Sequence, residues 1–207
     1  MKKWMMIITV FLCFFSILSC EKNKDSYCVN TIKNSPNITT LSETEMNMIK
    51  HLFNHNQLDY KKYQFAQLQE DELGYRHVRC EQFANNLIIF MSDVIFHFDK
   101  NDNYYYLSGD LINKVNLNTK SSMKHDNIVE TFIDEMKRDS FYKDNIEIMN
   151  GCFEIEFGYY DISDGDEEFT KTWKIKPTNK NYPYAYINDN NSEIIYYDNG
   201  IRLYRPY

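Results

Sequence analysis

Residues 75–111 read YRHVRCEQFANNLIIFMSDVIFHFDKNDNYYYLSGDL, and this stretch decides the expected fold. His77–Ala84 alternates between polar and apolar residues, Leu87–Phe98 ends with an apolar residue at every second position, and Asn103–Ser108 follows as a third β-prone run. Turns rich in Asn and Asp separate the three runs. Because strands joined by short connections most simply pair with their neighbours, we expect an antiparallel meander.

A short amphipathic helix is predicted ahead of the meander. Ser42 and Glu45 have the Ser-x-x-Glu spacing of a helix capping box. The apolar residues that follow recur at helical intervals, and the helix is expected to end near Asn54. The run Tyr63–Gln69 predicts one more strand between this helix and the meander. The apolar positions of the helix are Met46, Ile49, Leu52 and Phe53.

From about Val115 the same order, a helix followed by antiparallel strands, starts again. Apolar spacing predicts a second amphipathic helix that ends near Asp139 and buries Ile128, Phe132, Ile133 and Met136. The chain is therefore expected to be an α+β protein with two similar units. The strands predicted after the second helix are Ile146–Met149, Cys152–Phe157, Phe169–Lys176, Tyr182–Asn188 and Glu193–Tyr197.

The first residues have the features of an export signal. Two lysines precede the apolar run Trp4–Leu18, which is too short to span a bilayer comfortably. The run ends in Ser-Cys, which resembles a bacterial lipobox, and the alternative is an ordinary signal peptide that happens to end in Cys. We expect residues 1–19 to be a lipoprotein signal peptide, Cys20 to be lipidated, and residues 20–40 to be a polar tether.

Lipidation would determine where the protein resides. Several acyl chains on Cys20 would anchor it stably, since a single chain binds only marginally. The expected location is therefore the bacterial cell envelope, at the outer membrane. The sequence leaves open whether the anchored protein faces the periplasm or the exterior.

Export also makes a disulfide possible. Beyond the signal and Cys20, three thiols remain, Cys28, Cys80 and Cys152, so at most one intramolecular disulfide can form. The sequence does not choose the pair. Cys80 and Cys152 lie in β-prone runs, and we expect both to be buried free thiols.

Charge and the lack of catalytic motifs restrict the function. The chain has 23 basic and 30 acidic residues, which argues against nucleic acid as a partner. It contains no H-E-x-x-H, no G-x-S-x-G and no phosphate-binding glycine-rich loop. His51 and His55 have the i, i+4 spacing of zinc ligands, but Leu52 stands where the catalytic Glu would be and no third ligand follows. We expect no enzymatic activity, no metal and no cofactor.

Asp161–Glu168 is a dense acidic turn. Hard oxygen ligands could hold calcium, but their spacing differs from that of an EF-hand loop. A solvated hairpin turn is the favoured interpretation, and a weak cation site stays open.

The meander resembles the FTP segment, the first half of the pro-region of thermolysin-like and fungalysin-type metallopeptidases. In that family a strand H-V-R-F-x-Q is followed by N-G-x-P-V, a strand ending in His, an Asp/Gly turn and a strand closing with Ser-Gly. Here Asn86 and Asp102 replace Gly, and Ile88 replaces Pro. Asn and Asp tolerate left-handed backbone conformations, so the turns remain plausible. The corresponding residues are His77–Gln82, Asn85–Ile89, His97, Asp99–Asn103 and Ser108-Gly109.

The second unit resembles the PepSY domain, which follows FTP in those pro-regions. Ile187–Ile195 fits its frame of a strand, a turn of the form D-A-x-T-G, a Glu and apolar residues, and Trp173–Ile175 fits the preceding strand. Asn188, Asp189 and Ser192 replace the Asp, Ala and Gly of the family.

The two resemblances together imply a fold and a function. They imply two cystatin-like units, each one helix packed on an antiparallel sheet, with an FTP-like unit at residues 41–114 and a PepSY-like unit at residues 115–207. Since family pro-regions inhibit their own peptidase and assist its folding, they imply a non-catalytic protein that binds or inhibits a secreted or envelope metallopeptidase. The alternative is a surface binding module for a peptide, glycan or small ligand. Tyrosines gathered on one face beside a pocket would favour it, and the candidates are Tyr105, Tyr160 and Tyr196.

Arg79, Gln82 and His97 stand at the polar motif positions of the family. Strand alternation places His77 and Arg79 on one face and Gln82 on the opposite face. Two interpretations remain open. The three side chains either form hydrogen bonds within the protein or present a patch to a partner.

Overall fold

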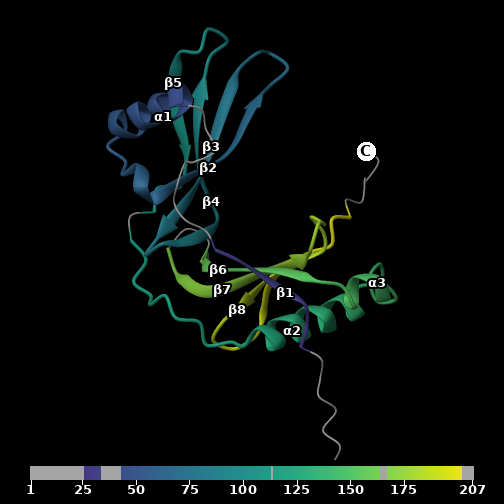
Figure 1. Cartoon of the computed structure of the whole chain (residues 1–207). Coiled ribbons are helices and arrows are strands. Elements are labelled where there is room, and N and C mark those ends of the chain that lie inside the picture. Colours follow the sequence, from purple (N-terminus) through teal and green to yellow (C-terminus); the bar gives the residue numbers. More distant parts are fainter. Residues whose placement is uncertain (1–25, 34–42, 113, 164–166, 202–207) are drawn as a thin grey trace, which may run out of the picture.

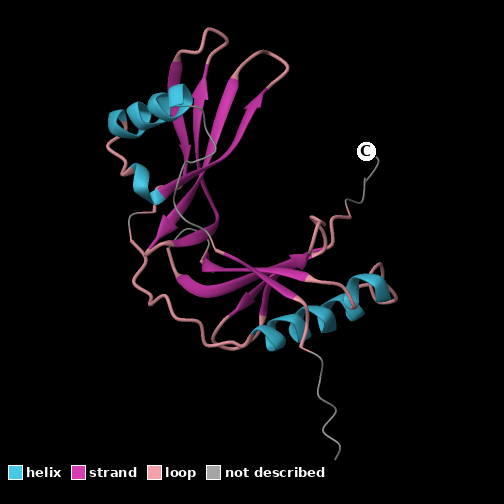
Figure 2. Cartoon of the chain, viewed as in Figure 1, coloured by secondary structure: helices cyan, strands magenta, loops and turns pink. Residues whose placement is uncertain are grey.

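The computed structural model describes residues 26–33, 43–112, 114–163 and 167–201. These residues form an α+β structure with a large, mostly antiparallel sheet (Figure 1, Figure 2), so the predicted class is confirmed. The helical elements are α1 (Glu43–His55), the 3-10 turn η1 (Tyr60–Lys62), α2 (His125–Arg138) and α3 (Ile146–Met149). The strands are β1 (Val29–Ile32), β2 (Tyr63–Glu70), β3 (Arg76–Ala84), β4 (Leu87–Phe98), β5 (Tyr104–Gly109), β6 (Phe153–Asp161), β7 (Phe169–Pro177), β8 (Tyr184–Asn188) and β9 (Ile194–Asp198).

The predicted meander is confirmed as β3, β4 and β5, and β2 lies antiparallel beside β3. Val78 pairs with Phe96, and Cys80 pairs with Val94, across the β3–β4 register. These side chains are buried together with Phe53 of α1, whose ring centroid lies 5.0 Å from that of Phe96. Helix α1 therefore covers one face of β2–β5, and in the described part of the chain no helix covers the other face (Figure 1).

The turns of the meander use Asn and Asp in the left-handed backbone region. The φ angles are 53° at Asn85, 65° at Asn86 and 62° at Asp102. These residue types adopt that region at small cost, so the expectation that Asn86 and Asp102 can stand in for glycine is confirmed.

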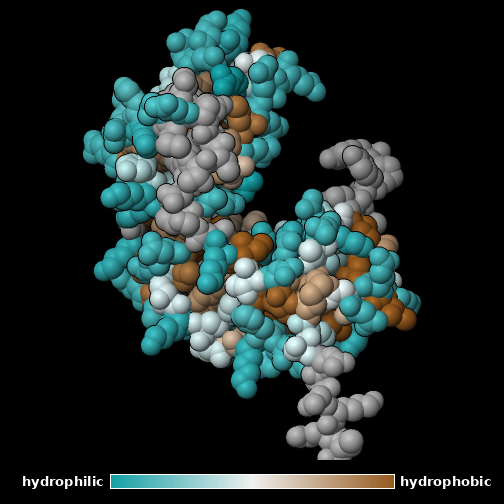
Figure 3. Space-filling view, in the orientation of Figure 1, coloured by the Kyte–Doolittle hydropathy of each residue, from teal (hydrophilic) through white to brown (hydrophobic). Residues whose placement is uncertain are grey.

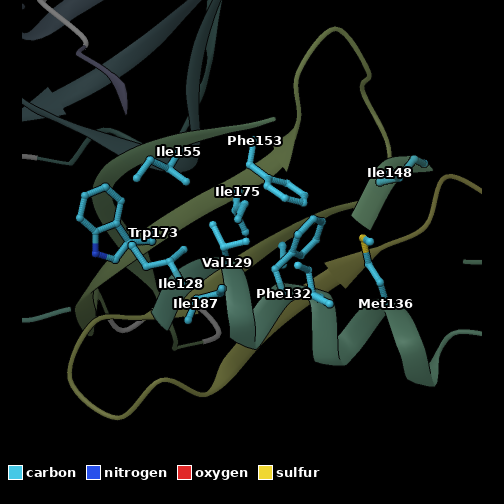
Figure 4. Close-up of a cluster of buried hydrophobic side chains, with 12 residues drawn as sticks. Ile128, Val129, Phe132, Met136, Ile148, Phe153, Ile155, Trp173, Ile175 and Ile187 are labelled. Atoms are coloured by element: carbon cyan, nitrogen blue, oxygen red, sulfur yellow. The ribbon is translucent and has the colours of Figure 1, made fainter. Parts of the chain in front are cut away.

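Helix α2 covers β6–β9 and forms the larger core of the described chain (Figure 4). The ring of Phe132 meets that of Phe153 edge-to-face at a centroid distance of 5.8 Å. Burying each large apolar side chain contributes about 1.5–3 kcal/mol, so this helix depends on the sheet for its stability. All four apolar positions predicted for this helix are buried, namely Ile128, Phe132, Ile133 and Met136.

Strands β4 and β6 pair in parallel, Ile88 with Gly158 and Phe90 with Tyr160. This pairing joins the N-terminal half (α1 and β2–β5) to the C-terminal half (α2, β1 and β6–β9) in a sheet that has nine strands within the described residues. The expectation of two cystatin-like units is thus not confirmed, because their strands share one sheet. In Figure 1 the helices lie on the outer sides of the two halves, and the faces without helices turn toward a common hollow, which Figure 3 also shows.

The tether expected at residues 20–40 is wrong for residues 29–32. These residues form β1, which pairs in parallel with β6, Val29 with Phe153. Cys28 forms a disulfide with Cys152, directly before both strands. The expectation that Cys152 is a free thiol is therefore wrong, whereas Cys80 is free and buried as predicted.

The strand predicted at Ile146–Met149 is wrong, because these residues form the helical turn α3. The side chain of Asn145 accepts a hydrogen bond from the backbone N–H of Ile148 at 3.1 Å and thereby caps the turn. An apolar run this short does not distinguish strand from helix.

Several expectations fall outside the described residues. They concern the signal peptide, the lipidation of Cys20, Ser42 of the capping box and the centre of the acidic turn, residues 164–166. Among the described helices, none is long and apolar enough to cross a membrane.

Removal of the disulfide should destabilise the protein. The bond spans 124 residues, and closing a loop of that size restricts the unfolded chain strongly. We expect the double variant Cys28→Ser/Cys152→Ser to lose about 2–5 kcal/mol of unfolding free energy in urea titrations. A reducing agent should lower the stability of the wild type and leave the double variant unchanged. Equal stability of the two proteins without reductant would contradict the expectation.

A methyl group at Gly158 should disrupt the pairing between the two halves. A Cβ atom there would lie 2.5 Å from the carbonyl oxygen of Ile88 and 2.8 Å from a ring carbon of Phe90. We expect Gly158→Ala to lower the unfolding free energy by about 1–3 kcal/mol, measured by urea titration. The matched control is Gly151→Ala, whose nearest atom lies 3.3 Å away and whose loss should be smaller. Equal losses in the two variants would refute this explanation.

Candidate binding face

The face of the sheet opposite α1 and α2, called the helix-free face below, carries many of the polar side chains in the sheet. Strand alternation turns His77, Arg79 and Glu81 of β3 away from the buried Val78 and Cys80. On β4, His97 lies directly opposite His77 in the register. In the C-terminal half the same face is formed by the residues of β6–β9 that point away from α2.

His97 lies at the centre of a chain of hydrogen bonds on this face. Its Nε2 atom is 2.7 Å from the hydroxyl of Ser108, and its Nδ1 atom is 2.8 Å from Nδ1 of His77. Nε2 of His77 lies 3.5 Å from a carboxylate oxygen of Asp71. The imidazole of His97 also stacks on the ring of Tyr106 at 4.0 Å. The arrangement holds β3, β4 and β5 together and fixes the ring of His97.

Arg79 shares the helix-free face with His97. Its Nε atom donates to a carboxylate oxygen of Asp93 at 2.7 Å, and 45% of its side chain is exposed. An ion pair this exposed adds little stability, typically about 0–1 kcal/mol. The pair therefore leaves a charged group available at the surface.

Gln82 points to the opposite side of the sheet and is buried. Its amide nitrogen donates to the hydroxyl of Ser92 at 2.6 Å and to the backbone carbonyl of Asp110, and its oxygen accepts from the N–H of Ile112 at 3.2 Å. The structure thus brings Arg79 and His97 to one face and separates Gln82 from them. Gln82 fastens the segment that follows β5.

Asp189, a residue of the expected PepSY turn, is buried and fixes the segment that leads into α2. It accepts hydrogen bonds from Ser122 N–H at 2.7 Å and Trp173 Nε1 at 3.0 Å. Its carboxylate lies 3.3 Å from the ammonium of Lys171. Burial alone would raise the pKa of Asp189, but the hydrogen bonds from Ser121 and the neighbouring backbone outweigh it and hold the pKa below its ordinary value.

A group of tyrosines covers the helix-free face of the C-terminal half. The ring of Tyr186 lies 5.0 Å from that of Tyr160 and 6.2 Å from that of Tyr196. Tyr184 lies 5.8 Å from Tyr186. Tyr160 and Tyr196 thus share one face, whereas Tyr105 lies on the N-terminal half beside Tyr106. We call Tyr160, Tyr184, Tyr186 and Tyr196 the tyrosine group.

Tyr184, which is half-buried, and Tyr186, which is buried, were not predicted as members of this face. Their signal was their alternation with Ala185 and Ile187, which are buried against α2. A surface hollow adjoins the group and includes Phe90 and Tyr160 in its lining.

Glu156 lies on β6, where Lys174 of β7 separates it from Tyr186 in the register, and is only 8% exposed. One of its carboxylate oxygens, Oε1, is buried and has no hydrogen-bond partner. Burial raises the pKa of Glu156, Lys174 and Lys176 oppose the rise and Glu81 adds to it, and the pKa that results is about 7. No sequence pattern marks this residue, because its neighbours come from β3 and β7.

The described residues contain no group of three His, Cys, Asp or Glu side chains that could hold a metal ion. His51 is exposed on α1, and the ring of His55 lies 6.0 Å from that of Tyr104.

Comparison with known proteins identifies the meander. Residues 67–111 match the family described as the Fungalysin/Thermolysin Propeptide Motif, FTP. A bacillolysin of Bacillus amyloliquefaciens is 41% identical over 54 residues, which cover 26% of this chain and 10% of that protein. The bacillolysin of Bacillus subtilis strain 168 is 38% identical over 64 residues, which cover 31% of this chain and 12% of that protein. The chain therefore spans only about a tenth of the length of these relatives.

The chain thus contains a segment of the fungalysin/thermolysin propeptide type, as its sequence predicts, within residues 67–111. Among solved structures, the Bacillus megaterium YpeB C-terminal domain aligns with 77% of this chain and 66% of its own, at 12% identity and a TM-score of 0.44. A likeness this distant carries no argument about fold or function. The PepSY resemblance stays a prediction.

The histidine pair should make stability depend on pH. Burial and the neighbouring His77 lower the pKa of His97 below its ordinary value. Protonation of His97 puts a proton on both of its ring nitrogens, so neither nitrogen can then accept a hydrogen bond from Ser108 or His77. Because the unfolded chain binds the proton more readily, stability is complete above the ordinary histidine pKa of about 6.5 and falls as pH drops through the lower folded pKa.

Thermal unfolding across this pH range measures the effect. The other titratable groups around the ring are Asp71, Tyr105 and Tyr106. His97→Gln removes the titration and should flatten the pH profile by a few degrees at the acidic end. His51→Gln, on the exposed side of α1, should keep the profile of the wild type. A wild-type profile in His97→Gln would refute the assignment.

Proposed function

We propose that the protein is a non-catalytic protein that binds a thermolysin-like metallopeptidase in the manner of a protease pro-region and inhibits it. The observation that carries this proposal is the match of residues 67–111 to the fungalysin/thermolysin propeptide motif. A propeptide acts by contact with its peptidase, so the relevant property is a surface rather than a reactive group.

The roles of the motif side chains support a scaffold that presents such a surface. Gln82 and His97 form hydrogen bonds within the protein, and these bonds fix the positions of β3, β4 and β5. Arg79 stays exposed on the helix-free face. That face is concave between the two halves (Figure 3), which suits a convex partner.

The proposal includes the arrangement of the two units and the location of the protein. Two cystatin-like units, FTP-like and PepSY-like, would share the sheet described above. Lipid on Cys20 would hold the protein in the cell envelope, at the outer membrane, where secreted metallopeptidases pass. Nucleic acid has no part in this proposal, because the chain carries a formal net charge of −7.

A second candidate function is a surface binding module for a peptide. The specific observation in its favour is the tyrosine group, in which the partly exposed Tyr160 and Tyr196 flank the buried Tyr186 on the helix-free face. Aromatic rings on an open face are typical of interfaces.

Titration of the purified protein into mature bacillolysin of Bacillus subtilis tests the first proposal. We expect hydrolysis of a protein substrate to fall in proportion to the added protein and a complex to elute earlier in size-exclusion chromatography. A serine peptidase should be unaffected in the same assay. Unchanged bacillolysin activity together with no complex at micromolar concentrations would refute the proposal.

A further inference from the structure

The edge of β4 opens into a surface hollow between β5 and β6. Strand β5 pairs with residues 94–98 of β4 and β6 pairs with residues 88–90, so both registers leave out residues 91–93. The hollow beside this gap, called the β4 hollow below, measures about 690 Å³. A volume of this size is typical of sites that hold a small ligand or a few side chains.

One wall of the β4 hollow is the segment after β5, which Gln82 holds against the sheet. The side-chain amide nitrogen of Gln82 donates to the carbonyl oxygen of Asp110, and its side-chain oxygen accepts from the N–H of Ile112 at 3.2 Å. Gly109 lets this segment pass close to β4, since a Cβ atom there would overlap the carbonyl oxygen of Asp93. The wall is therefore in place before any ligand binds, which lowers the entropic cost of binding.

Apolar side chains line the hollow, and two of them are unusually exposed. Met91 is 66% exposed and Leu111 is 41% exposed, and the rings of Phe90 and Tyr160 lie beside them. The backbone of Met91 has a φ angle of 60°, a left-handed conformation that is costly for a residue with a long side chain. A flexible apolar side chain held there at the surface is typical of a contact with another molecule.

Carboxylates surround this apolar lining. They belong to Asp110, Asp161 and Glu167, and none of the described residues that line the hollow is basic. Burial and Tyr196 raise the pKa of Tyr160, and the charge of Asp161 adds to the rise, so this carboxylate lies near the ring. Within the described part of the chain, none of the three carboxylates takes part in an ion pair. The hollow thus combines apolar surface with uncompensated negative charge.

We propose that the β4 hollow binds a lysine side chain and an adjoining apolar residue, both presented by an extended peptide segment of a partner. The lysine stem lies along the apolar lining, and its ammonium stays in contact with solvent among the three carboxylates. The adjoining apolar residue packs against Met91 and Leu111. The inference rests on the second candidate function, the peptide module, and names its ligand and its site.

Lysine fits the β4 hollow better than arginine does. The three carboxylates come from separate segments, and a compact ammonium can turn its three donors toward more than one of them. A guanidinium forms its best bonds with one carboxylate that lies in its plane.

Nuclear magnetic resonance titration of the full protein with a blocked pentapeptide that contains leucine followed by lysine tests the inference. At millimolar concentrations we expect saturable shifts of the backbone amides of Met91, Ser92 and Leu111, and weaker binding when salt is added. The same peptide with acetyllysine, which keeps the stem and lacks the charge, should bind severalfold more weakly. Equal binding of these two peptides, tighter binding of an arginine peptide, or no saturable shift would overturn the proposal.

Matched variants locate the site. Asp110→Asn removes a carboxylate and keeps the backbone carbonyl that Gln82 bonds, so it should fold and bind the lysine peptide severalfold more weakly. Asp144→Asn removes the same charge from an exposed position before α3 and should bind as the wild type does. Met91→Gly removes the thioether and suits the left-handed backbone, so it should also retain the fold and weaken binding. Wild-type binding in both Asp110→Asn and Met91→Gly would contradict the assignment.

Failure of this site can be told apart from failure of either candidate function. Shifts confined to Tyr184 and Tyr196 would overturn the lysine site and leave a peptide module at the tyrosine group. The titration contains no peptidase, so its outcome is independent of the inhibition assay.

Discussion

The parallel pairing of β4 with β6 is the constraint on which the arrangement of the molecule depends. It spans three residue pairs, and it is the contact that turns two helix-covered groups of strands into one sheet. Parallel pairing requires the two backbones to approach closely, and the position opposite Ile88 has space only for glycine. Because α1 and α2 lie on the outer sides, this contact also brings the polar residues of β3 next to the tyrosines of β6 and β8. The residues that form both candidate surfaces are therefore brought together by the short β4–β6 pairing.

The two faces of the meander have different roles, and this difference follows from the same geometry. One side of each strand is committed to α1, and the other side carries the polar motif residues. His97 uses both ring nitrogens within the protein, whereas Arg79 keeps nearly half of its side chain exposed. Most of the motif residues therefore hold the strands in place, and fewer of them are exposed to a possible partner. This arrangement suits the contact with a peptidase that is proposed above.

The spacing of apolar residues predicted the elements whose structure depends mainly on neighbouring residues in the sequence. The limits of β4 agree with the prediction at both ends, because alternation and the Asn turns mark them within a few residues of sequence. The core positions of α2 follow from helical periodicity in the same way. In contrast, β1 has no periodicity of its own and exists because Cys28 and the edge of β6 hold it. Three pairings of Cys28, Cys80 and Cys152 are possible, and the spacing of the cysteines does not show that Cys28 bonds to Cys152. Glu156 escaped notice for a related reason, since its environment is assembled from Glu81 and Lys174, which are far apart in the sequence.

The disulfide next to β1 has a mechanical consequence for a protein held at its N-terminus. A pulling force on the chain ahead of Cys28 passes through the S–S bond into the start of β6, beneath α2, and bypasses α1 and the meander. Because β1 and β6 are parallel and begin at the same level, the disulfide joins them at the end that is pulled, and such a force does not slide one strand along the other. If Cys20 carries the lipid, the eight residues to Cys28 span at most about 28 Å, so Cys28 and the start of β1 stay within that distance of the bilayer.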